Sequence, residues 1–96
     1  MPERYATLFG VTGTYCHPEA DEEAYGALRR LAGRANDAPM ALFKEELRRA
    51  LTHPEEVPEE ALYREVQYGD GGAAEFLRRL WRDLYPEEPT PTPEKR

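Results

Sequence analysis

The chain has 96 residues, of which 40 % are hydrophobic and 33 % charged, with a formal net charge of −6 and a pI near 4.9. This length corresponds to one small domain, and the excess of acids argues against a protein that holds nucleic acid phosphates with basic side chains. The apolar runs are far shorter than the roughly 20 residues that cross a bilayer, no signal peptide is recognisable, and the single Cys16 excludes an internal disulfide, so we expect a cytoplasmic protein without membrane contact.

The first fifteen residues give a mixed signal. Tyr5, Leu8, Phe9 and Thr12 fit one face of a helix. Glycines at positions 10 and 13 each weaken a helix by about 1 kcal/mol relative to alanine, and the segment 11–15 could instead be extended. We predict a helix that breaks near Gly13.

Two longer helices follow. Residues 19–35 place Ala24, Leu28, Leu31 and Ala35 at helical spacing, with acids at the start and arginines at the end that complement the helix dipole. The segment 36–39 then offers an N-cap followed by proline in the first turn. The next apolar stripe consists of Met40, Phe43, Leu47 and Ala50 or Leu51, and it ends at residues 52–54.

The last two helices flank a turn rich in glycine. A short helix over 58–67 would bury Ala61, Leu62 and Val66. In the turn 68–72, Gly69 is suited to a C-cap and Asp70 to the next N-cap. The helix 72–85 has the clearest apolar face, formed by Ala73, Phe76, Leu77, Leu80, Trp81 and Leu84.

We therefore expect an all-α protein with one helical domain of four to five helices over residues 1–85. The remaining residues, 86–96, contain four prolines that alternate with polar residues. Such a segment lacks backbone donors and apolar side chains, so we expect an extended, disordered tail.

Signatures of catalysis are scarce. The sequence has no Walker loop, no GxGxxG, CxxC or HExxH motif, and no serine. Cys16 and His17 are adjacent, but neighbouring side chains usually point apart, so a structural thiol is favoured over a nucleophile. Cys16, His17 and His53 lack the close ligand pairs of zinc sites. We expect no catalytic residues, no metal site and no cofactor.

Charge distribution is more informative than any motif. Two segments, 17–28 and 50–63, carry four acids each and neither lysine nor arginine. If the fold joins them, they form one negative surface that would attract a basic partner; helix-dipole preferences alone could also explain them. Tyrosines accompany both segments, and tyrosine is common at protein interfaces. The predicted partner-binding residues are Glu19, Asp21, Glu22, Glu23, Tyr25, Glu55, Glu56, Glu59, Glu60 and Tyr63.

The order of these features resembles the small helical immunity proteins of contact-dependent growth inhibition systems. The corresponding pieces are Leu8-Phe9-Gly10, the segment 13–21, the acidic start at 22–25, the helix 43–51, the turn 68–72 and the segment 75–78. The resemblance implies an all-helical protein that binds a cognate toxin domain and blocks it without chemistry. Many such toxins are basic nucleases, which an acidic surface with tyrosines would suit.

Two functions are therefore expected from the sequence. The first is an immunity protein that neutralises a basic toxin domain, and the alternative is a regulatory or adaptor module for another protein. Protection against a cognate toxin would separate them, because an adaptor does not rescue a poisoned cell. The sequence leaves the identity of the partner and the oligomeric state open.

Overall fold

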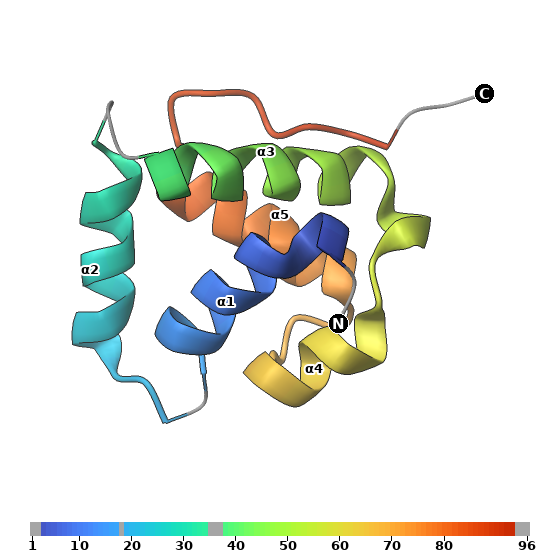
Figure 1. Ribbon diagram of the computed structural model, residues 1–96, viewed down its shortest axis with the longest axis horizontal. Helices are drawn as coiled ribbons and strands as arrows, with labels where there is room; N and C mark the ends of the chain where they lie inside the picture. Colours follow the sequence, from blue (N-terminus) through green and yellow to red (C-terminus); the bar gives the residue numbers. More distant parts are fainter. Residues whose placement is uncertain (1–2, 18, 35–37, 94–96) are drawn as a thin grey trace.

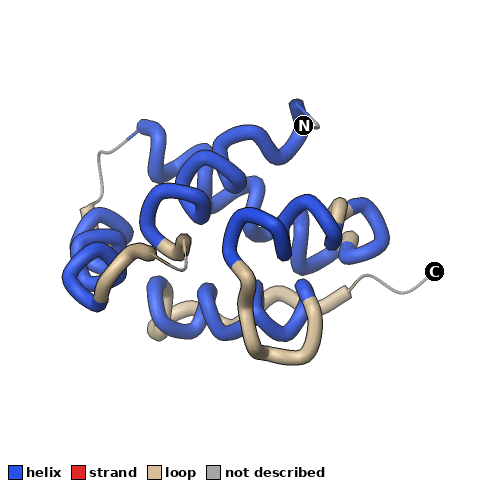
Figure 2. The backbone as a smooth tube through the Cα atoms, turned by 90° about the horizontal axis from the view of Figure 1, so that it is seen from below, coloured by secondary structure: helices blue, strands red, loops and turns tan. Residues whose placement is uncertain are grey.

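The computed structural model describes residues 3–17, 19–34 and 38–93. Across these residues the chain forms five α-helices and two short 3-10 helices, without a β-strand (Figures 1 and 2). The elements are η1 (Glu3–Tyr5), α1 (Ala6–Tyr15), α2 (Glu22–Ala32), α3 (Ala38–Thr52), η2 (Pro54–Glu56), α4 (Glu59–Val66) and α5 (Ala73–Leu84). The predicted all-α, single-domain fold is confirmed. No helix within the described ranges has both the length and the apolarity that spanning a bilayer requires.

The molecule measures 38 × 28 × 24 Å, and α3 runs along its upper side in Figure 1 with α5 packed against it. Helix α1 packs against α2, α3 and α4, and α5 also contacts these three helices. In Figure 1, α2 stands at the left end of the molecule, whereas η2 lies at the right edge and α4 at the lower right. This arrangement places the starts of α2 and α4 on different sides of α1.

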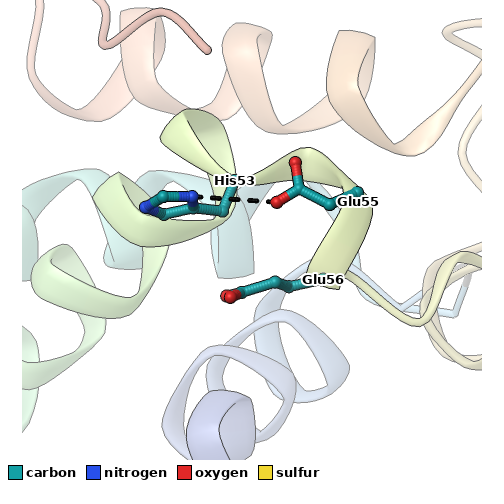
Figure 3. A group of neighbouring side chains, drawn as sticks. All are labelled: His53, Glu55 and Glu56. Atoms are coloured by element: carbon teal, nitrogen blue, oxygen red, sulfur yellow. Dashed lines mark ion pairs between the residues drawn. The ribbon is translucent and has the colours of Figure 1, made fainter. Parts of the chain in front are cut away.

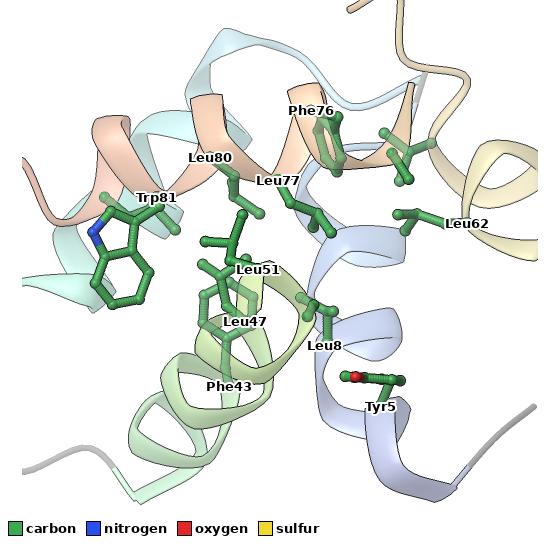
Figure 4. Packing of buried hydrophobic residues seen from close by; sticks show 14 of the residues in the cluster. Tyr5, Leu8, Phe43, Leu47, Leu51, Leu62, Phe76, Leu77, Leu80 and Trp81 are labelled. Carbon is green, nitrogen blue, oxygen red and sulfur yellow. The ribbon is translucent and has the colours of Figure 1, made fainter. Parts of the chain in front are cut away.

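The core is built from the apolar faces that the sequence periodicity predicts (Figure 4). On α3 the whole predicted stripe is buried, with Phe43 and Leu47 fully enclosed. Helix α5 buries its entire predicted face, including Trp81. The predicted helices 19–35, 40–52, 58–67 and 72–85 are therefore confirmed, apart from small differences at their ends. Ala35, Asn36 and Asp37 lie outside the described residues.

Helix α1 differs from the prediction, since it continues through Gly13 to Tyr15. The predicted break near Gly13 is wrong, and so is the extended alternative. Leu8 and Phe9 are buried in the core, and this burial outweighs the cost of two glycines. Gly13 also faces α4, because a Cβ atom built there would lie 3.1 Å from Glu65 Oε2.

The predicted caps of the turn 68–72 are also wrong. Helix α4 ends at Gln67, which adopts a left-handed conformation with φ 51° and ψ 47°. Asp70 forms a two-pronged ion pair with Arg79, at 2.7 and 3.1 Å, and does not cap α5. The N-cap of α5 is Gly72, which has no side chain. The backbone N–H groups at the start of α5 must therefore find an acceptor on another residue.

The C-terminal segment contains neither helix nor strand over residues 86–93, as the sequence predicts. It nevertheless turns back and runs along α3 (Figure 1). Glu88 forms ion pairs with Lys44 and Arg48, contacts that the composition of the tail did not predict. The mobility of the tail stays a prediction.

Candidate functional site

The first predicted acidic segment lies at the start of α2, and its carboxylates are on the surface. Glu19, Glu22 and Glu23 are exposed. Asp21 is the N-cap of α2, because its Oδ1 accepts a hydrogen bond from the Ala24 N–H at 3.0 Å. This segment therefore combines a capping role with three carboxylates that remain open to solvent.

Tyr25 was grouped with these acids, but its hydroxyl is engaged inside the molecule. It donates a hydrogen bond to Asp83 Oδ2 on α5 at 2.7 Å. Burial, together with this hydrogen bond to a carboxylate, raises the pKa of Tyr25. The side chain is only half-buried, but its polar end connects α2 to α5.

In the second acidic segment, Glu56 is already paired. Arg49 donates two hydrogen bonds to its carboxylate, at 2.9 and 3.0 Å, and Arg4 approaches it at 3.1 Å. Tyr5, which is buried, donates a further hydrogen bond at 2.9 Å. These donors, Arg49 first among them, lower the pKa of Glu56 to about 2. Glu56 therefore holds η2 against η1 and α3 and offers no free charge to a partner.

Glu59 also has a structural role, although it is exposed. Its Oε2 accepts a hydrogen bond from the Ala73 N–H at 2.8 Å, at the first residue of α5. A carboxylate at a helix N-terminus satisfies a donor and complements the helix dipole. Glu59 thus supplies the cap that Gly72 cannot provide, and it joins α4 to α5.

The exposed part of α4 borders a hollow of about 660 Å³. We call it the α4 hollow, and it is lined by Glu59, Glu60, Tyr63, Arg64, Tyr68, Gly71 and Gly72. Tyr63 is 51 % exposed, one of only two large hydrophobic side chains in the described residues with such exposure. Its ring meets the edge of Tyr68 at a centroid distance of 5.2 Å, and Tyr68 stacks in turn on Phe76 of the core.

The predicted residues do not form one continuous surface. The acids of α2 and those of η2 lie at opposite ends of the view in Figure 1, with α1 between them. Only the C-terminal end of α4 approaches α2: Val66 and Gln67 line a hollow of about 400 Å³ together with Asp21 and Glu22. The two acidic segments are therefore separate surfaces, of which only the second borders an exposed aromatic ring.

One group of three side chains in the described ranges could supply metal ligands, namely His53, Glu55 and Glu56 (Figure 3). Nδ1 of His53 lies 3.7 Å from the Glu55 carboxylate. Glu56, however, is bound to Arg49 and Arg4, and two guanidinium groups at a carboxylate oppose the approach of a cation. The group does not fit a metal ion.

Cys16 is partly buried, as predicted for a structural thiol. Burial raises its pKa to about 11, so the thiol stays protonated at neutral pH. Nδ1 of His17 accepts a hydrogen bond from the Glu19 N–H at 3.1 Å, which occupies the nitrogen that a base would use. The pair lacks the features of an activated nucleophile.

Sequence reasoning missed part of the α4 hollow. Arg64, Tyr68, Gly71 and Gly72 line it and were not among the predicted partner-binding residues. The adjacent glycines were a usable signal, since two residues without side chains leave open space beside a helix start. No comparable signal marked Lys44, Arg48 and Glu88, which meet only through the path of the tail.

Comparisons with known proteins add no relative: no family model, no curated protein and no solved structure matches the chain.

Proposed function

We propose that this protein acts by binding a basic partner protein at the α4 hollow, as an immunity protein that occludes a toxin domain would. The observation that carries the proposal is Tyr63, a half-exposed aromatic ring that stands among carboxylates at the edge of a hollow. The proposal narrows the predicted surface to one of the two acidic segments.

Tyr63 has the properties of an interface anchor. Tyr68 supports its ring from one side, and Tyr68 itself rests on Phe76, which is fully buried. A ring held in this way loses little side-chain entropy when a partner covers it. Truncation of such an anchor typically costs about 2 kcal/mol or more of binding free energy.

The charges around the ring favour a cationic group in the partner. The Glu60 side chain is 93 % exposed, and its ion pair with Arg64 is long at 3.9 Å. Such exposed pairs contribute about 0–1 kcal/mol, so a partner's arginine or lysine can replace Arg64 at small cost. The Glu59 carboxylate lines the same hollow while it accepts the hydrogen bond from the Ala73 N–H. A cation there would meet carboxylates and the face of Tyr63 together.

The immunity role rests on the resemblance described above, and the hollow supports it by its chemistry. A toxin that cleaves nucleic acid carries cationic side chains for its substrate's phosphates. An acidic surface with an aromatic anchor can cover such side chains without any reaction. The adaptor alternative uses the same surface, so only the effect on the partner's activity separates the two functions.

Capture experiments with charge-matched variants test the proposal. Glu60 and Glu23 are each the second residue of their helices, both are exposed, and each becomes lysine in one variant. A protein retained at low salt by the wild type and by Glu23→Lys, but lost with Glu60→Lys, identifies the partner of the α4 hollow. The partner is then produced in cells with and without this protein. If the partner alone arrests growth, and co-production of this protein restores growth, the result supports the immunity function.

Two results would contradict the proposal. A partner that Glu60→Lys and Glu23→Lys retain equally well does not bind at the α4 hollow. A partner that binds there but harms no cell makes the protein an adaptor.

A further inference from the structure

A second site lies on the side of the molecule opposite α4, where the C-terminal segment leaves α5 and runs along α3 (Figure 1). Lys44 and Arg48 of α3 and Trp81 of α5 hold Glu88, and the Tyr85 ring lies beside Lys44; we call these four side chains the tail site. Lys44 and Arg48 pair with the Glu88 carboxylate, Arg48 at 3.6 Å. The Trp81 indole N–H donates a hydrogen bond to the Glu88 backbone carbonyl at 3.3 Å.

The cations of the tail site are held in place by aromatic rings. Lys44 Nζ lies 4.6 Å from the centroid of the Tyr85 ring, and the Arg48 guanidinium lies 5.1 Å from that of Trp81. Trp81 is fully buried, and its ring tilts against Tyr85 at a centroid distance of 5.0 Å. A buried indole donor and two positioned cations form a built receptor for a carboxylate and the carbonyl of the same residue.

The segment that fills this site is attached at one point. Among residues 86–93, Glu88 alone makes hydrogen bonds or ion pairs, including a bond from its N–H to the Tyr85 carbonyl at 3.1 Å, whereas its neighbour Glu87 is exposed. Prolines at 86, 89, 91 and 93 have no N–H to donate to α3. Ion pairs of this exposure are weak singly, so the segment can be released without disturbing the helices. Beside it, Met40, Ala41 and Leu84 help to line a hollow of about 650 Å³.

We propose that the tail site is a binding site for an acidic, proline-flanked peptide segment, and that the chain's own tail occupies it as an internal competitor. Its two recognition elements, a paired carboxylate and a bonded carbonyl, can be offered by any segment of Pro-Glu-Glu-Pro character that adopts the turn seen at residues 86–88. The tethered tail has an effective concentration in the millimolar range, so a free segment binds only after the tail is released. This site is distinct from the α4 hollow, whose carboxylates suit a basic group.

Trp81 is the only tryptophan in the chain, so its fluorescence reports directly on the tail site. The full-length Glu88→Lys variant places a cation against Lys44 and Arg48 and should release the tail. Glu87→Lys changes the same charge at the exposed neighbour and is the matched control. We expect Glu88→Lys to shift Trp81 emission to longer wavelength and to increase its quenching by acrylamide, whereas Glu87→Lys should match the wild type.

A synthetic peptide of residues 86–93 then serves as the probe. It should bind Glu88→Lys and reverse the emission shift, bind the wild type much more weakly, and lose affinity when its own Glu88 is replaced by glutamine. Identical Trp81 emission in the two variants would overturn the role of the tail. If the Glu88→Lys protein bound neither the peptide with glutamate at position 88 nor the peptide with glutamine there, or bound both equally well, the assignment of an acidic ligand would be overturned. Because no partner protein is used, failure here leaves the proposed function at the α4 hollow untouched.

Discussion

Replacement of Glu46 by alanine should destabilise the protein, because this carboxylate caps α1 from another helix. Glu46 is buried on α3, and its Oε1 accepts a hydrogen bond from the Leu8 N–H at 2.8 Å. The residue at the N-cap of α1, Tyr5, makes no side-chain capping bond. Glu46 therefore satisfies a backbone donor in the first turn of α1 and places a negative charge near the positive end of the helix dipole.

The size of the expected destabilisation by Glu46→Ala follows from these contacts. A hydrogen bond to a charged group contributes about 1.5–3 kcal/mol, and the loss of a cap costs about 0.5–2 kcal/mol. The two values describe the same bond and are not added. Removal of a buried carboxylate also relieves its desolvation, so we expect a net loss of about 2 kcal/mol in the free energy of unfolding. For a domain of this size the melting temperature should fall by about 8–16 °C.

Thermal and urea unfolding, followed by circular dichroism at the helix band, measure this loss. Glu45→Ala is the control, since it removes an exposed carboxylate from the adjacent position of α3. Glu46→Gln keeps an acceptor oxygen without the charge and should fall between the two. If Glu46→Ala and Glu45→Ala unfold at the same temperature, the inter-helix cap does not stabilise the fold.

Three further predictions concern single groups. The pKa of Glu56 is lowered to about 2, so its contribution to stability is complete above the unfolded pKa of 4.5 and is lost as the pH falls toward 2. Glu56→Gln should melt below the wild type at neutral pH, and the two melting curves should converge near pH 2; a constant difference would contradict this. The raised pKa of Cys16, about 11 against 9.0, predicts about a hundredfold slower alkylation at pH 8 in the folded protein than in urea. Equal rates would show an accessible thiolate. Gln67 holds φ at 51°, so Gln67→Gly should stabilise by about 0.5–1 kcal/mol in urea titrations, and a loss of stability would refute strain at this cap.

The helices could be predicted because their apolar stripes are local patterns. On α5, Phe76, Leu77, Leu80, Trp81 and Leu84 recur at helical spacing, and all are buried. The way the helices begin could not be predicted, because two caps come from distant residues. Glu46 lies 38 positions from Leu8, whose N–H it caps, and Glu59 lies 14 positions from Ala73. Neither hydrogen bond can therefore be recognised from the sequence around the helix start.

The sequence predicted which types of residue make up the candidate site, but not how these residues are arranged in space. Clusters of acids and tyrosines were visible in the sequence, and Glu60 and Tyr63 are exposed as expected. Glu56 and Glu59 appeared equivalent to Glu60 along the chain, yet one is held by Arg49 and the other caps α5. Which acid remains available depends on donors that folding brings near it. For the same reason the separation of the two acidic segments became visible only in three dimensions.

The most direct test of binding at the α4 hollow uses the captured partner and a comparison at two salt concentrations. Dissociation constants of the wild type, Glu60→Lys and Glu23→Lys are measured at low and at high salt. We expect Glu60→Lys to bind more weakly and to lose part of the salt dependence, because its charge no longer attracts a cationic partner, whereas Glu23→Lys should follow the wild type. Unchanged affinity and unchanged salt dependence in Glu60→Lys would contradict recognition of a basic partner at the α4 hollow.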